Sequence, residues 1–95
     1  MVAYVVVVKE RTLDPAQEAI YASKGRAASA GHPITVRALR TKYELLEGPP
    51  IETVSILEFP SFDEARAWYY SPAYQEALPH RLKGGDYRAI IVDGV

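Results

Sequence analysis

The sequence predicts an α+β fold in which strands and helices follow one another in the order β-α-β-β-α-β. Three observations predict it: β-branched segments near both ends of the chain, helix-capping residues before two helical regions, and a strand-like segment from Thr53 to Phe59. With right-handed crossovers, this order gives one antiparallel sheet with strand order 4-1-3-2 and both helical regions on one face. We therefore expect a ferredoxin-like βαββαβ sandwich.

The first helical region is expected to begin at Asp14-Pro15. Asp14 suits the N-cap, Pro15 suits the first helical position, and Gln17 stands where a capping-box partner would. Gly31 provides a C-terminal stop. A stripe of small residues at helical spacing runs along this region and comprises Ala16, Ala19, Ile20, Ser23, Ala27 and Ala30.

The second helical region is expected to begin at Ser61, which forms a capping box with Glu64. Ser71-Pro72 restarts the helix, because serine caps well and proline fits the first turn. We expect Pro79 to disturb the end of this second piece, since it lacks an amide donor.

Four segments are predicted to be strands. They are Val2–Val8, Ile34–Leu46 with a bend or break near Thr41, Thr53–Phe59 and Tyr87–Val92. Gly48-Pro49-Pro50 forces a loop between the second and third strands, and Gly84-Gly85-Asp86 is predicted to be a turn before the last strand.

The composition is that of an ordinary globular domain. The 95 residues predict one domain over residues 1–95, with 48% hydrophobic and 24% charged residues. A net charge of -1 argues against nucleic-acid binding. The absence of cysteine excludes disulfides and thiolate chemistry. With no segment long enough to span a membrane and no signal-peptide pattern, we expect a cytoplasmic protein that does not bind membranes.

The strands carry apolar side chains on both faces. In the first strand Val5 and Val7 point one way and Val6 and Val8 the other, and the last strand opposes Ile91 to its neighbours. One face is covered by helices, and monomers rarely expose the large apolar patch that the other would form. The pattern therefore predicts a homodimer through face-to-face packing of the two sheets, which would make a dimeric α/β barrel.

Such a dimer can leave a cavity between sheet and helices in each subunit. Polar residues interrupt the otherwise apolar strands and are predicted to line or rim that cavity. They are Arg37, Arg40, Ser55, Glu58, Arg88 and Asp93.

The segment from Leu57 to Gln75, followed by Arg81, carries a dense motif. Its distinctive positions are Glu58, Phe59, Pro60, Ser61, Ala65, Trp68, Tyr69, Ser71, Pro72, Tyr74 and Arg81. This segment resembles the signature of the DUF1330 family, a set of small proteins of unknown function in the dimeric α/β-barrel superfamily. The resemblance implies a ferredoxin-like subunit and a dimer, and it brings no established reaction. Many members have Arg-Gly-Gly where this chain has Arg40-Thr41-Lys42, so only Arg40 carries over.

Two charged residues of the motif are candidate site residues. Glu58 ends an apolar strand, where partial burial suits a general base; equally, it could form an ion pair with an arginine or lie in water. Arg81 could bind an acidic ligand or clamp Glu58 within the subunit.

Aromatic residues supply the candidate binding surface. Trp68, Tyr69 and Tyr74 are spaced as one helical face, which suits either a core or the wall of a pocket for a flat apolar ligand. Tyr4 could place a hydroxyl in the same pocket or be a core tyrosine.

His32 lies between the first helical region and the second strand, where it could serve as a general base. The chain has only one other histidine, His80, which lies far from it in the sequence, so the two make a poor metal-ligand pair. The sequence therefore predicts no metal site and no cofactor.

Two functions remain open from the sequence. The first is a ligand-binding dimer whose pocket takes a small apolar or aromatic acid at Arg40 or Arg81. Any turnover would proceed by cofactor-independent proton transfer or oxygenation with Glu58 or His32 as the base. The second is a non-enzymatic ligand-sensing or structural dimerisation module, in which the motif residues are structural.

Overall fold

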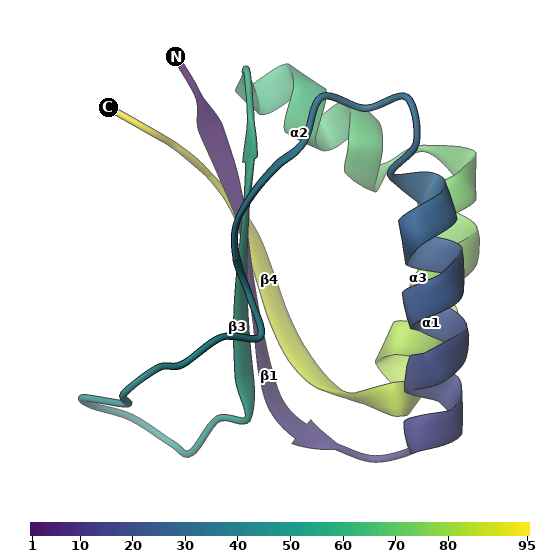
Figure 1. Cartoon of the computed structure of the whole chain (residues 1–95), viewed down its shortest axis with the longest axis vertical. Coiled ribbons are helices and arrows are strands. Elements are labelled where there is room, and N and C mark those ends of the chain that lie inside the picture. Colours follow the sequence, from purple (N-terminus) through teal and green to yellow (C-terminus); the bar gives the residue numbers. More distant parts are fainter.

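A computed structural model describes every residue from Met1 to Val95 and shows the predicted order of elements, with the second helical region split in two (Figure 1). The elements are β1 (Ala3–Thr12), α1 (Pro15–Ala28), β2 (Thr35–Leu39), β3 (Thr53–Phe59), α2 (Phe62–Tyr69), α3 (Pro72–Gly84) and β4 (Gly85–Asp93). No helix is both long and apolar enough to cross a membrane.

The sheet has the predicted topology. Its strands lie in the order β2-β3-β1-β4, which is the predicted order read from the other edge, and every pairing is antiparallel. Val5 pairs with Leu57 on one side and Ile91 on the other. All three helices lie on one side of the sheet (Figure 1). The ferredoxin-like α+β fold is therefore confirmed.

The N-caps form as the sequence predicts, whereas the Gln17 side chain shares a hydrogen bond with His80 rather than closing a capping box. The Asp14 carboxylate accepts hydrogen bonds from the amides of Ala16 and Gln17 at 3.0 and 3.4 Å. The Ser61 hydroxyl accepts from the Glu64 amide at 3.1 Å, which opens α2. Each cap satisfies amide donors that the first helical turn leaves without partners.

Pro79 does not disturb α3, contrary to expectation. The helix passes through it and continues to Gly84. Pro79 removes one amide donor on an exposed side of the helix, while Ala77 and Arg81 are buried on either side of it. The packing of those neighbours outweighs the loss of one hydrogen bond.

The small-residue stripe of α1 does not face the protein interior. All six of its members are exposed. The helix instead turns Glu18, Tyr21 and Ala28 towards α3 and the sheet, and Ala28 is its only buried residue. The inward face of α1 is partly polar, so a pattern based on small apolar residues points to the wrong side.

The second strand is shorter than predicted. It ends at Leu39, and Arg40 takes a positive φ of 51° that turns the chain out of the strand. The Arg40 amide still donates to the Val54 carbonyl at 3.0 Å. Residues 41–52 then form a loop that projects from the sheet on the side away from the helices (Figure 1).

The predicted turn at Gly84-Gly85-Asp86 is absent, and α3 passes directly into β4. Close packing against Glu18 and Arg11 explains why Gly84 and Gly85 carry no side chain. A Cβ on Gly84 would lie 2.6 Å from Cγ of Glu18, and one on Gly85 would lie 2.7 Å from the carbonyl oxygen of Arg11. The start of α1 therefore packs directly on the α3–β4 junction.

The tightly packed core is small and gathers at one end of the molecule. Phe59, Ala65, Trp68 and Tyr74 are at most 3% exposed, and Val5 joins them from the sheet. These residues lie where β3 meets α2 and α3. Towards the other end the two layers separate, and a cavity lies between them.

Candidate functional site

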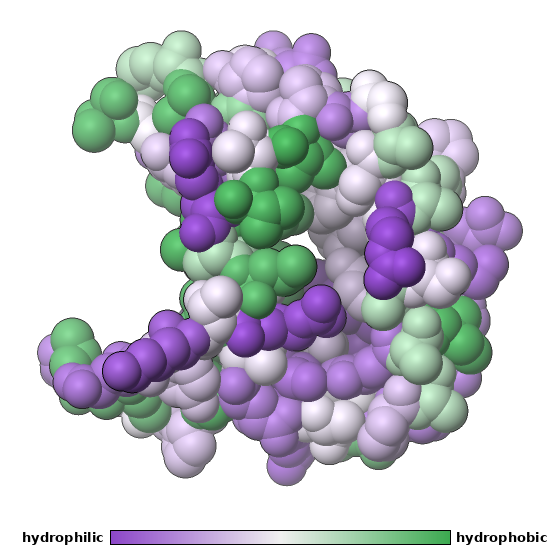
Figure 2. All heavy atoms as spheres, viewed as in Figure 1, coloured by the Kyte–Doolittle hydropathy of each residue, from purple (hydrophilic) through white to green (hydrophobic).

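The cavity between the sheet and the helices has a volume of about 500 Å³ and is open to solvent (Figure 2). Side chains from β1, β2, β3 and β4 form one wall, and side chains from all three helices form the other. Its volume is in the range typical of small-molecule sites.

Apolar and aromatic side chains form its inner surface. Val7 and Leu57 contribute from the sheet, and Tyr21, Trp68 and Tyr74 from the helices. The rings of Trp68 and Tyr74 lie 4.3 Å apart between centroids. The arrangement offers a flat ligand a rigid aromatic surface.

Tyrosine hydroxyls give this surface polar contacts. The hydroxyls of Tyr21 and Tyr74 lie 2.9 Å apart and share a hydrogen bond. Burial, and then the neighbouring Tyr21, raise the pKa of Tyr74 far above the usual tyrosine range. The Tyr74 hydroxyl therefore stays protonated at physiological pH, and the pair can donate a hydrogen bond to a ligand.

Arg81 lines the cavity and is 4% exposed. Its Nε and Nη1 atoms have no hydrogen-bond partner, and no carboxylate of the chain lies within ion-pair distance. The ring of Tyr87 lies beside it, with its centroid 5.2 Å from the guanidinium carbon. A buried cation without a counter-ion is strongly unfavourable, so the cavity contains an uncompensated positive charge.

A second cluster on the wall was not singled out from the sequence. The Tyr87 hydroxyl donates to Oε1 of Glu18 at 2.7 Å, and Nζ of Lys9 lies 3.1 Å from Oε2 of the same carboxylate. Burial, followed by the bond to Glu18, raises the pKa of Tyr87. Lys9 neutralises Glu18, so this cluster adds no net charge to the cavity.

The sequence contained a signal for these residues. Glu18 and Tyr21 are three positions apart and share one side of a helix. Lys9 continues the alternation of Val5 and Val7 in β1, so it belongs to the same sheet face. The signal was hidden because the inward side of α1 is less apolar than its exposed stripe.

The opening of the cavity is basic. Arg26 from α1, His32 from the segment after it, and Arg40 from the end of β2 all line it. His32 and Arg40, both candidate site residues from the sequence, therefore line one cavity. Arg26 was not singled out from the sequence. Left-handed backbone at a residue such as Arg40 costs about 1–2 kcal/mol.

Glu58 lies on the opposite face of the sheet. Leu57 and Phe59 point towards the helices, so Glu58 between them points away. Its carboxylate is bound by Arg37, with Nε–Oε1 and Nη2–Oε2 distances of 3.1 and 3.3 Å. The hydrogen bond and charge of Glu58 raise the pKa of Arg37. The prediction that Glu58 lines the cavity, and the proposed pair with Arg81, are therefore wrong.

Further predicted positions also lie outside the cavity, including Arg37, which binds Glu58, and Asp93 at the end of β4. Tyr4 pairs in register with Glu58 and shares its outward face. Arg88 pairs with Val8 on that same face. Tyr69 is half-buried behind the wall, with its ring 5.3 Å from that of Tyr74. Of the aromatic candidates, Trp68 and Tyr74 line the cavity directly.

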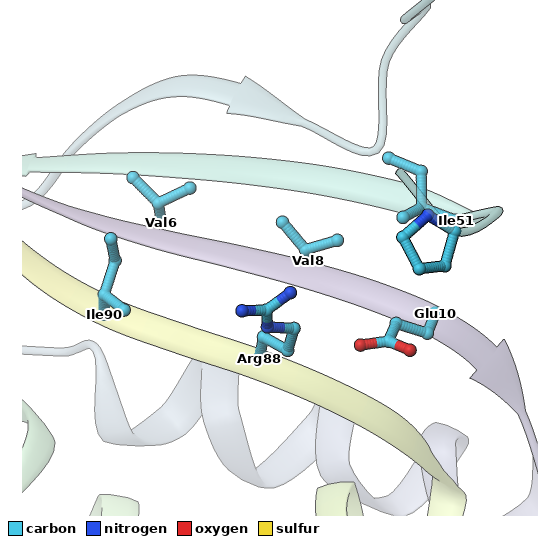
Figure 3. Close-up of a pocket in the computed structure, with 7 residues that line it drawn as sticks. Val6, Val8, Glu10, Ile51, Arg88 and Ile90 are labelled. Carbon is cyan, nitrogen blue, oxygen red and sulfur yellow. The ribbon is translucent and has the colours of Figure 1, made fainter. Parts of the chain in front are cut away.

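The outward face of the sheet is apolar and carries a shallow hollow of about 200 Å³ (Figure 3). Val6 and Val8 of β1 and Ile90 of β4 form its floor. Arg88 lies beside Val8, and Glu10 lies at the end of the hollow where Ile51 stands at the base of the projecting loop (Figure 3). Elsewhere in the molecule, no three His, Asp or Glu side chains gather as a metal-ligand set.

Solved structures share this fold. The protein RPA0582 of unknown function from Rhodopseudomonas palustris is 21% identical, with a TM-score of 0.70 over 99% of this chain and 82% of that one. A dimeric protein of unknown function with a ferredoxin-like fold from Bacteroides fragilis is 12% identical, with a TM-score of 0.59 over 98% and 96%. SnoaB, a cofactor-independent oxygenase from Streptomyces nogalater, is 15% identical, with a TM-score of 0.59 over 98% and 91%.

At these identities the likeness shows the fold alone, and it defines the protein as a ferredoxin-like α+β protein. No curated protein matches the chain. The family model described as "Domain of unknown function (DUF1330)" matches residues 2–95, and the chain belongs to this family.

Proposed function

We propose that the protein binds a small apolar or aromatic acid in the cavity between the sheet and the helices. The observation that carries this proposal is the buried guanidinium of Arg81, which lines the cavity without a counter-ion. A ligand carboxylate would neutralise it through charge-assisted hydrogen bonds, which are about twice as strong as neutral ones.

The rest of the cavity suits the body of such a ligand. Trp68 and Tyr74 offer aromatic surface, and Leu57 offers an apolar wall from the sheet. The paired hydroxyls of Tyr21 and Tyr74 can orient a polar substituent. Apolar surface combined with placed polar groups is the usual make-up of a specific small-molecule site.

We place this site in a homodimer formed through the outward faces of two sheets. Ile90 is 59% exposed and Val92 43% exposed on that face, beside Val6 and Val8. A partner sheet would remove these side chains from water, which is the main source of stability in such associations. The structural neighbour from Bacteroides fragilis is described as dimeric, which supports this assembly.

A reaction on the bound acid would proceed by proton transfer, with His32 as the base. His32 lines the cavity, whereas Glu58 lies on the opposite face of the sheet. The cofactor-independent oxygenase among the structural neighbours illustrates chemistry that this fold can support. Without such turnover, the same cavity would act as the binding site of a ligand-sensing module.

Trp68 provides a direct test, because it is the only tryptophan and it lines the cavity. Benzoate and cinnamate are titrated into the protein while the tryptophan fluorescence is recorded. We expect saturable quenching, and we expect Arg81→Met to weaken the affinity by about tenfold or more through loss of a charged hydrogen bond. The variant should keep its circular dichroism and melting temperature, because methionine removes a buried charge that has no partner.

Glu58→Gln is the matched control, since it changes a charge on the opposite face of the sheet. It should leave the quenching curve unchanged. An affinity that Arg81→Met does not alter would refute the assigned role of Arg81. Unfolding of Arg81→Met would instead support a purely structural motif.

A further inference from the structure

The charges that line the cavity do not balance. Its charged side chains are Lys9, Glu18, Arg26, Arg40 and Arg81. Lys9 and Glu18 neutralise one another at 3.1 Å, which leaves three guanidinium groups. None of the three has an ion-pair partner in the chain. The chain as a whole has a net charge of -1, so this surplus of positive charge is a property of the cavity rather than of the composition.

The three guanidinium groups stand in two places. Arg81 is buried in the helical wall, whereas Arg26 and Arg40 are exposed at the opening. Arg26 comes from α1 and Arg40 from the end of β2, so the two approach the opening from the two layers of the fold. Strongly hydrophilic side chains lie on both sides of the hollow, over the helices and over the sheet (Figure 2). Apolar and aromatic residues, among them Leu57, Trp68 and Tyr74, line the same cavity.

The backbone at Arg40 adds an independent observation. Its φ of 51° lies in the left-handed region, where glycine is the favoured residue. Arg40 is exposed and makes no side-chain hydrogen bond or ion pair that would stabilise this conformation. Strained backbone of this kind is concentrated at functional sites. The strain is explained if the Arg40 side chain has a partner outside the chain.

From this arrangement we infer that the ligand is a dicarboxylic acid with an apolar or aromatic body. One carboxylate binds Arg81 in the interior, and the other binds Arg26 and Arg40 at the opening. This inference rests on the proposed function and narrows its ligand class from an acid to a diacid.

Two matched pairs of probes test the inference. Each pair compares a monocarboxylate with the corresponding dicarboxylate: benzoate with terephthalate, and cinnamate with para-carboxycinnamate. Affinities are measured by quenching of Trp68 and checked by isothermal titration calorimetry. In the native protein, at least one dicarboxylate is expected to bind about tenfold more tightly than its monocarboxylate, as one added charged hydrogen bond requires.

A double variant removes the second anchor alone. Arg26→Gln and Arg40→Gly together should abolish the preference for the dicarboxylate and leave monocarboxylate affinity within about threefold of the native value. Glycine at position 40 suits the positive φ, so folding is retained. Lys24→Gln is the matched control: it removes a positive charge from the exposed side of the same helix, outside the cavity, and should preserve the preference.

Each outcome separates the two levels of the proposal. Equal affinities within both pairs, or a preference that survives the double variant, would overturn the diacid while leaving the acid-binding cavity in place. If Lys24→Gln removed the dicarboxylate preference as fully as the double variant does, general surface charge would explain the preference, and the diacid inference would again be overturned. If none of the four probes binds, the proposed function fails and the diacid fails with it.

Discussion

Arg81 could be singled out from the sequence, but its surroundings could not. The motif that contains it is recognisable in the chain, and so is Glu58. Whether the two meet depends on which face of β3 carries Glu58. That strand has apolar residues on both faces, so its alternation alone does not say which face meets the helices. The structure puts Glu58 beside Arg37 and leaves Arg81 without a carboxylate.

Serine caps illustrate the opposite case at the same scale. Ser61 and Ser71 were predicted as caps, and both accept hydrogen bonds from the amide three residues later. A cap depends only on the residues of its own helical turn. Local interactions of this kind can be predicted from the sequence, whereas a contact between distant residues requires the complete fold.

The buried tyrosines predict how stability depends on pH. Folding raises the pKa of Tyr74 above its usual value of 10.0, so the folded state keeps the hydroxyl protonated after the unfolded chain has released its proton. This contribution to stability is fully present below pH 10 and declines as the pH rises further. We expect the free energy of unfolding by urea to fall steeply between about pH 10 and 11.

The Tyr74→Phe variant isolates that contribution. Phenylalanine has no proton to lose, so its unfolding free energy should decline less steeply over the same pH range. The absolute stability of the variant also drops, because Tyr21 loses its hydrogen-bond partner; the slope against pH is therefore the quantity to compare. Identical slopes for the two proteins would contradict this explanation.

At the scale of elements, the sequence predicts which helices and strands exist and in what order, but it predicts less well which side of each faces the interior. β3 has the predicted bounds, Thr53–Phe59. β2 is shorter than predicted because Arg40 leaves the strand. The sequence left the orientation of α1 open, because its inward side lines a polar cavity rather than an apolar core. Hydrophobic periodicity identifies a buried helical face only where that face packs against apolar neighbours.

The junction between α3 and β4 predicts an unequal response to two similar substitutions. Gly85→Ala should lower the free energy of unfolding by about 1–3 kcal/mol, because its new methyl group would lie 2.7 Å from the backbone oxygen of Arg11. Gly25→Ala inside α1 is the comparison. Its methyl group would meet Tyr21 at an ordinary 3.5 Å, so helix propensity should raise stability by about 1 kcal/mol.

Urea unfolding of the three proteins checks this contrast. The two variants differ from the native chain by the same single methyl group, so a shared effect on the unfolded state largely cancels between them. If Gly85→Ala proved as stable as the native protein, close packing at the junction would not be the reason for its glycine.

The whole molecule uses the two faces of its sheet differently. One face looks across a cavity towards the helices, and the other presents Val6, Val8 and Ile90 to solvent. The alternation of the strands predicted that both faces need cover. The family resemblance also implied a dimer. Neither the strand alternation nor the resemblance could describe the details of an interface between two chains.

A charge on the outward face should separate the proposed dimer. Ile90→Lys introduces an ammonium at a side chain that is 59% exposed in the single chain, so the subunit should fold while its association is lost. Size-exclusion chromatography with light scattering should give twice the subunit mass for the native protein at micromolar concentration and the single mass for the variant.

Leu82→Lys is the control for this experiment. Leu82 is 57% exposed on α3, on the side of the molecule opposite the sheet face. The Leu82→Lys variant should remain dimeric. A native protein that is monomeric at micromolar concentration, or a dimer that Ile90→Lys leaves intact, would rule out association through this face.

The cavity has a mechanical consequence. α1 packs mainly against α3 and has few contacts with the sheet. The Tyr21–Tyr74 and Gln17–His80 hydrogen bonds hold the two helices together. The molecule therefore consists of a sheet and a helix pair, joined at the glycine junction and at the core around Trp68. If the proposed ligand binds, the spacing between the sheet and the helix pair would limit its size, and the ligand would in turn fix that spacing.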